Sequence, residues 1–249
     1  MRGLLGRCGF GRPVGGFALL ALLAGPIAAE ESADQLALCK GEELPASQRI
    51  AACTRVIAAA QSNDELRIEA HLQRGVLYEL TGDRPAAQED YSNIIRLDPA
   101  NAVAYFNRGN VHDQQGELDL AIADYTEAIK LDPNDADVFN NRGQSYDSKG
   151  ETDLAIADYS QSIRLNKDNS RAYFNRALAY ANKGELKRAI ADLDAAIKLE
   201  PGDADAYVSR GSMHEELGNE DAARADYRRA LAISPDHADA KEALARVGN

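Results

Sequence analysis

Five arginines recur at intervals of 34 residues, and each stands directly before a glycine or an alanine in "HLQRG", "YFNRG", "FNNRG", "YFNRA" and "YVSRG". An aspartate follows every one of them after a further sixteen residues. The predicted partners are Arg74 with Asp90, Arg108 with Asp124, Arg142 with Asp158, Arg176 with Asp192, and Arg210 with Asp226. A guanidinium can hold a carboxylate through two parallel hydrogen bonds. Five ion pairs are therefore predicted, in a structural role, because a ligand site has no reason to recur at every repeat.

The four histidines do not form a pattern that suggests catalysis or metal binding. His71, His112 and His214 stand at repeat positions that elsewhere carry aromatic residues, and His237 lies in the last turn between repeats. A catalytic or zinc site needs several convergent groups, so we interpret these residues as packing residues. An enzyme or metal-dependent module remains the rival class. Turnover lost on changing His112 or His214 in a folded chain would support that rival.

The acidic turn "DPNDAD" at 132–137 resembles a calcium loop only in composition. Such a loop needs glycine at its sixth position and glutamate at its twelfth, where this chain has Gly143. The carboxylates are better suited to cap the next helix, whose first N–H groups lack partners. We therefore predict no metal, no cofactor and no small-molecule substrate.

The arginines divide the chain into five contiguous units of 34 residues: 68–101, 102–135, 136–169, 170–203 and 204–237. Positions eight and twenty of each unit are small, and positions four, eleven and twenty-four are mostly aromatic. Glycine at position fifteen and proline at the end of four units mark helix ends. Apolar spacings of three and four on both sides of that glycine predict two amphipathic helices per unit. The fold class is therefore all-α.

In period, small positions and aromatic positions, residues 68–237 resemble the tetratricopeptide repeat family. The chain departs from that family in lacking tryptophan; position four holds His71, Tyr105, Phe139, Tyr173 and Tyr207 instead. The resemblance implies a right-handed superhelical solenoid of antiparallel helix pairs. It also implies a non-catalytic adaptor or scaffold that binds another protein or peptide, of the exported bacterial type.

In that family, positions two, five, six, nine, twelve and thirteen of the first helix line a concave groove. Applied to this chain, these family positions give the following groove residues: Phe106, Asn107, Asn110, Asp113, Asn140, Asn141, Gln144, Asp147, Arg171, Phe174, Asn175, Asn182, Asp205, Ser209, Glu215 and Glu216. Such a trough can hydrogen-bond an extended backbone and hold an apolar anchor. A family subset holds a peptide carboxylate in a clamp; Asn110, Asn141 and Arg171 match it, but Phe106 and Asn175 replace two cations. The alternative is that these amides are only solvated.

The N-terminus carries Arg2, Arg7 and Arg12 around the start of an apolar run, "PVGGFALLALLAGPIAA". This pattern predicts a signal peptide over 1–29, cleaved after Ala29, and a periplasmic protein; an uncleaved membrane anchor is the weaker alternative. Residues 30–67 are interpreted as an N-terminal cap with a helix over 46–60. Cys39 and Cys53 predict a disulfide there, with buried free thiols as the alternative. Residues 238–249 predict a C-terminal capping helix.

The formal net charge is −12, and loss of the three leader arginines would make it −15. This balance argues against nucleic acid or an anionic membrane as the principal partner and favours a basic one. A structural subunit of a cell-envelope assembly, bound through its convex face or its ends, is the second interpretation.

Overall fold

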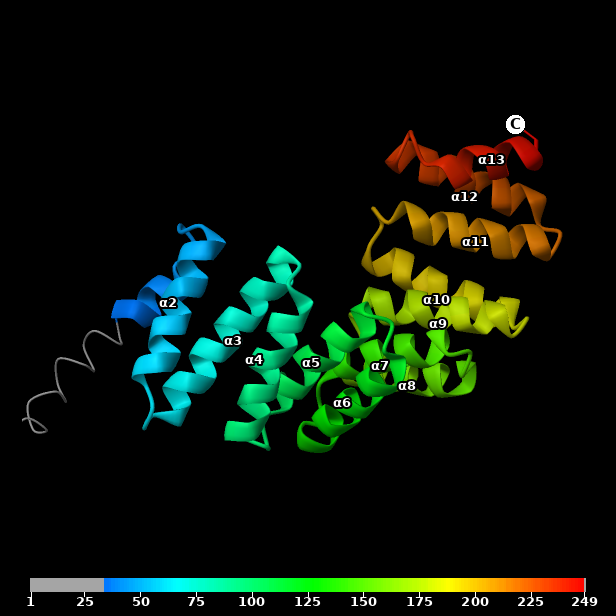
Figure 1. The fold of residues 1–249 in the computed structure, drawn as a ribbon. Helices are drawn as coiled ribbons and strands as arrows, with labels where there is room; N and C mark the ends of the chain where they lie inside the picture. Colours follow the sequence, from blue (N-terminus) through cyan, green and yellow to red (C-terminus); the bar gives the residue numbers. More distant parts are fainter. Residues whose placement is uncertain (1–33, 249) are drawn as a thin grey trace, which may run out of the picture.

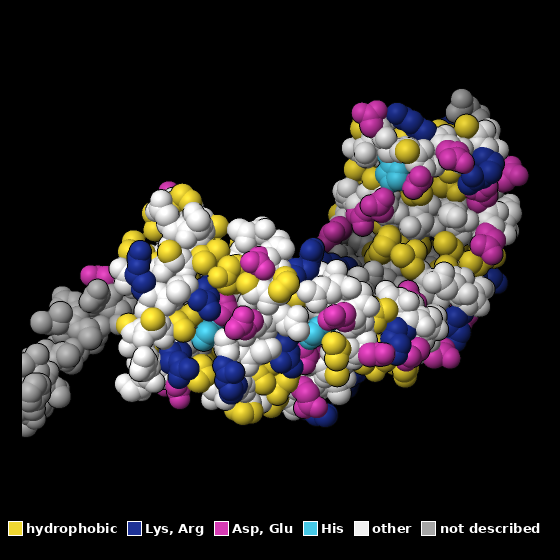
Figure 2. Space-filling view, viewed as in Figure 1, with side chains coloured by type: hydrophobic (Ala, Val, Ile, Leu, Met, Phe, Trp, Pro, Cys, Tyr) yellow, Lys and Arg dark blue, Asp and Glu magenta, His cyan; other side chains and the backbone are white. Residues whose placement is uncertain are grey.

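The computed structural model describes residues 34–248, and every regular element in that range is a helix. A short helix over residues 34–40 comes first. The others are α2 (Ala46–Ala59), α3 (Asp64–Thr81), α4 (Arg84–Leu97), α5 (Ala102–Gln114), α6 (Leu118–Leu131), α7 (Ala136–Ser148), α8 (Thr152–Leu165), α9 (Ser170–Asn182), α10 (Leu186–Leu199), α11 (Ala204–Glu216), α12 (Glu220–Ile233) and α13 (Ala238–Arg246). They stack in chain order as a curved array with α2 and α13 at opposite ends (Figure 1). The chain is thus an all-α solenoid of helix pairs. A notch opens between its N-terminal half and α11–α13 (Figure 2).

The helix boundaries follow from local chemistry. Gly116 and Gly150 end the first helices of their units with a φ of +77°, a left-handed conformation that side chains rarely adopt. At the start of α7, the Asp135 side chain accepts hydrogen bonds from the backbone N–H groups of Asp137 and Val138. The acidic turn therefore caps a helix, and its carboxylate complements the helix dipole.

The first repeat unit and the helix that it contains do not begin at the same residue. The N-terminal cap was expected to extend to residue 67, but α3 begins at Asp64, four residues before the first predicted unit. The Asn63 side chain caps α3 by accepting from the N–H of Leu66, and Asp64 and Glu65 suit the positive end of the helix dipole. No proline stands before this helix to interrupt it, unlike the linkers that precede α5, α7 and α11.

The two helices of a unit approach closely where a glycine meets a tyrosine ring. A Cβ atom placed on Gly143 would lie 2.8 Å from a ring carbon of Tyr159, and the same contact recurs in three other units. The fourth unit has Ala177 and Leu193 at the corresponding positions. The core thus keeps its volume because a larger residue at position eight accompanies a smaller one at position twenty-four.

Both ends of the array are covered. At the N-terminal end, Cys39 and Cys53 are joined as a disulfide and pack with Ala52 and Leu77 beneath the 34–40 helix. At the C-terminal end, α13 buries Ala240 and Ala243, and its Arg246 donates two hydrogen bonds to Glu215. The predicted signal peptide lies outside the described residues. Among residues 34–248, no helix has the length and apolar character needed to cross a bilayer.

Candidate protein-binding groove

Every recurring arginine donates from Nε and Nη2 to both oxygens of the aspartate sixteen residues on, at 2.6–2.9 Å. The aspartates are buried, and the arginines are mostly covered. The remaining nitrogen, Nη1, reaches the second helix of the preceding unit; Arg142, for example, donates to the Thr126 hydroxyl at 3.1 Å. Its guanidinium also lies 5.7 Å from the rings of Phe139 and Tyr146. Each arginine therefore joins helices within a unit and also joins adjacent units.

The histidines lie among the helices and do not converge on one another. His71 Nδ1 is 2.7 Å from Asp90, and His112 Nδ1 is 2.6 Å from Glu117. In the last unit, the corresponding Nδ1 of His214 is buried and has no hydrogen-bond partner among residues 34–248, because Asn219 stands where Glu117 stands in the second unit. Over residues 34–248, no three histidine, cysteine or acidic side chains form a group that could hold a metal ion.

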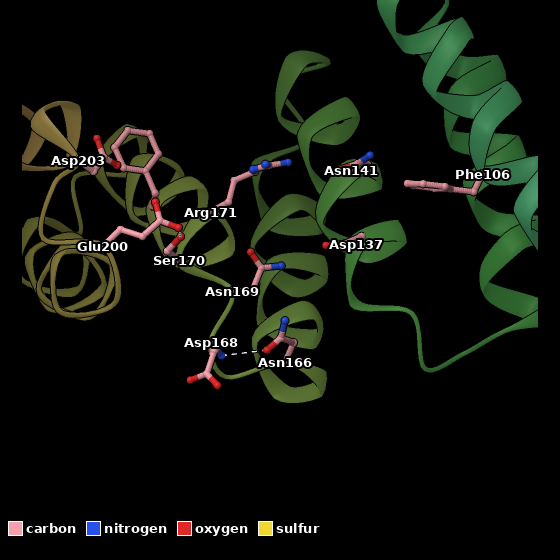
Figure 3. A pocket seen from close by; sticks show the side chains of 11 residues that line it. Phe106, Asp137, Asn141, Asn166, Asp168, Asn169, Ser170, Arg171, Glu200 and Asp203 are labelled. Atoms are coloured by element: carbon pink, nitrogen blue, oxygen red, sulfur yellow. Dashed lines mark hydrogen bonds between the residues drawn. The ribbon is translucent and has the colours of Figure 1, made fainter. Parts of the chain in front are cut away.

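One cavity lies across the first helices of the second, third and fourth units. It has a volume of about 530 Å³ and is lined by Phe106, Asp137, Asn141, Asn166, Asp168, Asn169, Ser170, Arg171, Phe174, Glu200 and Asp203. Arg171 extends across this space toward Asn141 and Phe106 (Figure 3). Its side chain is exposed, and no carboxylate of residues 34–248 lies within 4 Å of it. The cavity therefore combines a solvated cation with two aromatic side chains.

The asparagines of the predicted groove mainly contact one another. Asn175 donates to Asn140 at 3.1 Å, Asn140 to Asn141 at 3.3 Å, and Asn141 to Asn110 at 2.9 Å. Asn110 also accepts from the Tyr125 hydroxyl at 2.8 Å. The expectation that Asn140 lines the open groove is wrong: it is only 2% exposed, because its neighbours on α7 and α9 cover it. These amides form a ladder that fixes three adjacent units in register.

Other predicted groove residues remain open. Asn107 and Gln144 make no side-chain hydrogen bond within the described part of the chain, and Gln144 lines a second cavity of about 150 Å³ with Asp147 and Leu178. Asn107 is half-buried, whereas Gln144 is exposed. Groups of this kind keep donors and acceptors available for a partner.

Sequence reasoning missed that the first unit, residues 68–101, also contributes side chains to the groove. The same repeat positions, applied to residues 68–101, select Leu72, Val76 and Leu80, and Val103 belongs to the same set in the second unit. Leu80 is 76% exposed and Val103 is 53% exposed. The six groove positions of the first helix could have identified all four residues, since applying them needs only the 34-residue register. Apolar surface therefore continues from Phe106 toward the N-terminal end.

Comparisons with known proteins agree with this architecture. Protein-family models described as tetratricopeptide repeats match residues 68–101, 102–135, 124–157 and 184–238, and one described as TPR repeat matches 143–184. A search of curated protein sequences finds no match.

Solved structures with a similar fold include the crystal structure of MamA, at 27% identity and a TM-score of 0.62, covering 66% of this chain and 96% of that one. YrrB, described as "a TPR protein with an unusual peptide-binding site", has 24% identity and a TM-score of 0.63 over 77% and 96% of the chains. PilF of Pseudomonas aeruginosa has 18% identity and a TM-score of 0.73 over 88% and 99%. With repeat matches reaching from residue 68 to residue 238, the chain belongs to the tetratricopeptide repeat family.

Proposed function

We propose that the protein is a non-catalytic scaffold that binds a segment of another protein along its concave groove, centred on the cavity around Arg171. The observation that carries this proposal is that Arg171 is exposed and has no ion pair within residues 34–248, in a cavity that Phe106 and Phe174 also line. The repeat arginines, in contrast, are all held by aspartates. A solvated charge beside aromatic side chains is typical of a binding surface, in which aromatic and arginine residues contribute most of the affinity.

Family membership supports this proposal, because tetratricopeptide repeats are generally modules for protein interaction. The periplasm is the proposed location, from the basic and apolar N-terminus. An oxidising compartment would also keep Cys39 and Cys53 joined. Under reducing conditions the same pair would be free thiols.

A second candidate function is that of a structural subunit in an envelope assembly. The observation that favours it lies on the second helices, where Leu120 of α6 and Leu154 of α8 are 52% and 49% exposed. They occupy the same repeat position in adjacent units, so they lie on the same outer face of the array. An assembly partner could cover both.

Loss of partner capture by a groove variant is the expected result. We would crosslink residues 30–249 in the native envelope and compare Phe106→Ala/Arg171→Ala/Phe174→Ala with the matched surface variant Leu120→Ala/Leu154→Ala. The groove variant should lose the captured protein because its anchors are gone, whereas the surface variant should keep it. Circular dichroism checks that both variants are folded. The opposite outcome would assign the function to the outer face.

A further inference from the structure

A row of carboxylates runs along one side of the groove, at position twelve of the first helices. Its members are Glu79, Asp113, Asp147 and Glu215, and the fourth unit has Ala181 there. Seven residues earlier, at position five, stands a row of apolar side chains: Leu72, Phe106, Phe174 and Val208, with Asn140 in the third unit. Seven residues are about two helical turns, so the two rows run side by side, about 10 Å apart.

The first three of these carboxylates form no ion pair with a lysine or arginine in the described part of the chain. Glu79, Asp113 and Asp147 are half-buried, and no Lys or Arg nitrogen of residues 34–248 lies within 4 Å of them. Glu79 accepts a hydrogen bond from the Tyr91 hydroxyl, and Asp113 accepts one from Ser145. Burial raises the pKa of the Glu79 and Asp147 carboxyl groups above their ordinary values, because the charged form loses hydration.

Other covered carboxylates of the repeats do have a cationic partner. Asp124 and Asp158 each receive two hydrogen bonds from an arginine, and Glu215, the last member of the row, is paired with Arg246. An unpaired, partly desolvated charge is unfavourable until an opposite charge approaches it. The row along α3, α5 and α7 therefore presents negative charge that no lysine or arginine of residues 34–248 compensates.

We infer that the groove takes a basic amphipathic segment of a partner protein, with apolar side chains on the position-five row and lysines or arginines along Glu79, Asp113 and Asp147. This inference rests on the proposed function and adds the chemistry of the partner. A helix with its side chains is about 10–12 Å across, which matches the separation of the two rows. Amphipathic helices that dock in grooves place an apolar face inward, and their long basic side chains can reach a carboxylate at the rim.

A defined probe tests the inference with the full chain. The probe is a fluorescein-labelled 18-residue amphipathic peptide of leucine and lysine, and its partner probe carries glutamate in place of every lysine. We expect the anisotropy titration to show binding of the lysine peptide only. The variant Glu79→Gln/Asp113→Asn/Asp147→Asn should bind it at least tenfold more weakly, because the row loses its charge.

A charge-matched control separates the row from the net charge of the chain. Glu42→Gln/Glu43→Gln/Glu89→Gln removes the same charge from exposed positions outside the groove, and it should change the affinity less than twofold. Equal weakening by both triple variants would overturn the inference, and so would equal binding of the two peptides or no binding of the lysine peptide. If capture of the native partner still depends on Phe106, Arg171 and Phe174 in that case, the groove function stands and only the basic character of the partner is wrong.

Discussion

Replacing Asp158 by alanine is expected to lower the free energy of unfolding by about 3 kcal/mol, because it leaves Arg142 partly buried without its carboxylate. The Arg142 side chain is only 16% exposed, and that of Asp158 only 9%. Arg142 would keep a single hydrogen bond, to Thr126. Urea denaturation followed by circular dichroism measures the loss, with the midpoint and slope compared because a repeat array can unfold in parts.

The double-mutant cycle with Arg142→Ala decides whether the two residues act as a pair. We expect a coupling energy of about 1–3 kcal/mol, because Arg142→Ala removes a charge that Asp158→Ala has already left without its partner. Glu127→Ala is the control, because its pair with Lys130 is exposed and should be worth less than about 1 kcal/mol. Strictly additive losses at Arg142 and Asp158 would contradict the structural role of the repeat arginine.

Gly143→Ala is expected to destabilise the chain by about 2 kcal/mol, although alanine favours a helix over glycine by about 1 kcal/mol. The added methyl group would lie 2.8 Å from a carbon of the Tyr159 ring, which is buried. Combining it with Tyr159→Leu reproduces the arrangement of Ala177 and Leu193 in the fourth unit. The double variant should therefore be more stable than the sum of the two single losses predicts.

Thermal and urea unfolding of the single and double variants test this compensation. Gly202→Ala is the control, because a Cβ atom there meets nothing within 4 Å, and it should change stability by less than about 0.5 kcal/mol. A double variant whose loss equals the sum of the single losses would show that position eight and position twenty-four do not compensate each other.

The sequence supported the helix pairs and the arginine partners because both depend on one strict period. Position seven and position twenty-three face each other whenever two antiparallel helices meet around a glycine at position fifteen. The start of α3 was missed, because the period fixes where a repeat begins but not how far its first helix can grow toward the N-terminus. The Asn63 side chain, which caps α3, determines where that helix begins.

The amide ladder could not be predicted from the sequence. Whether Asn140 faces the open groove or a neighbouring amide depends on the rotation between adjacent units, which the period alone does not determine. The same rotation brings Asn175 of α9 to Asn140 of α7. The carboxylate row, in contrast, follows from position twelve of the repeat. Whether a lysine or arginine pairs with it depends on how the side chains of adjacent helices pack, which the period does not determine.

Photo-crosslinking tests the central claim, that the concave groove holds the partner, most directly. A photoreactive amino acid replaces Gln144, an exposed groove residue, in one chain and Leu154, on the outer face of α8, in another. Both chains are irradiated in the native envelope, and the crosslinked protein is identified. We predict that position 144 captures the partner and that position 154 does not. Capture through position 154 alone would contradict a groove-binding scaffold and place the interaction on the outer helices.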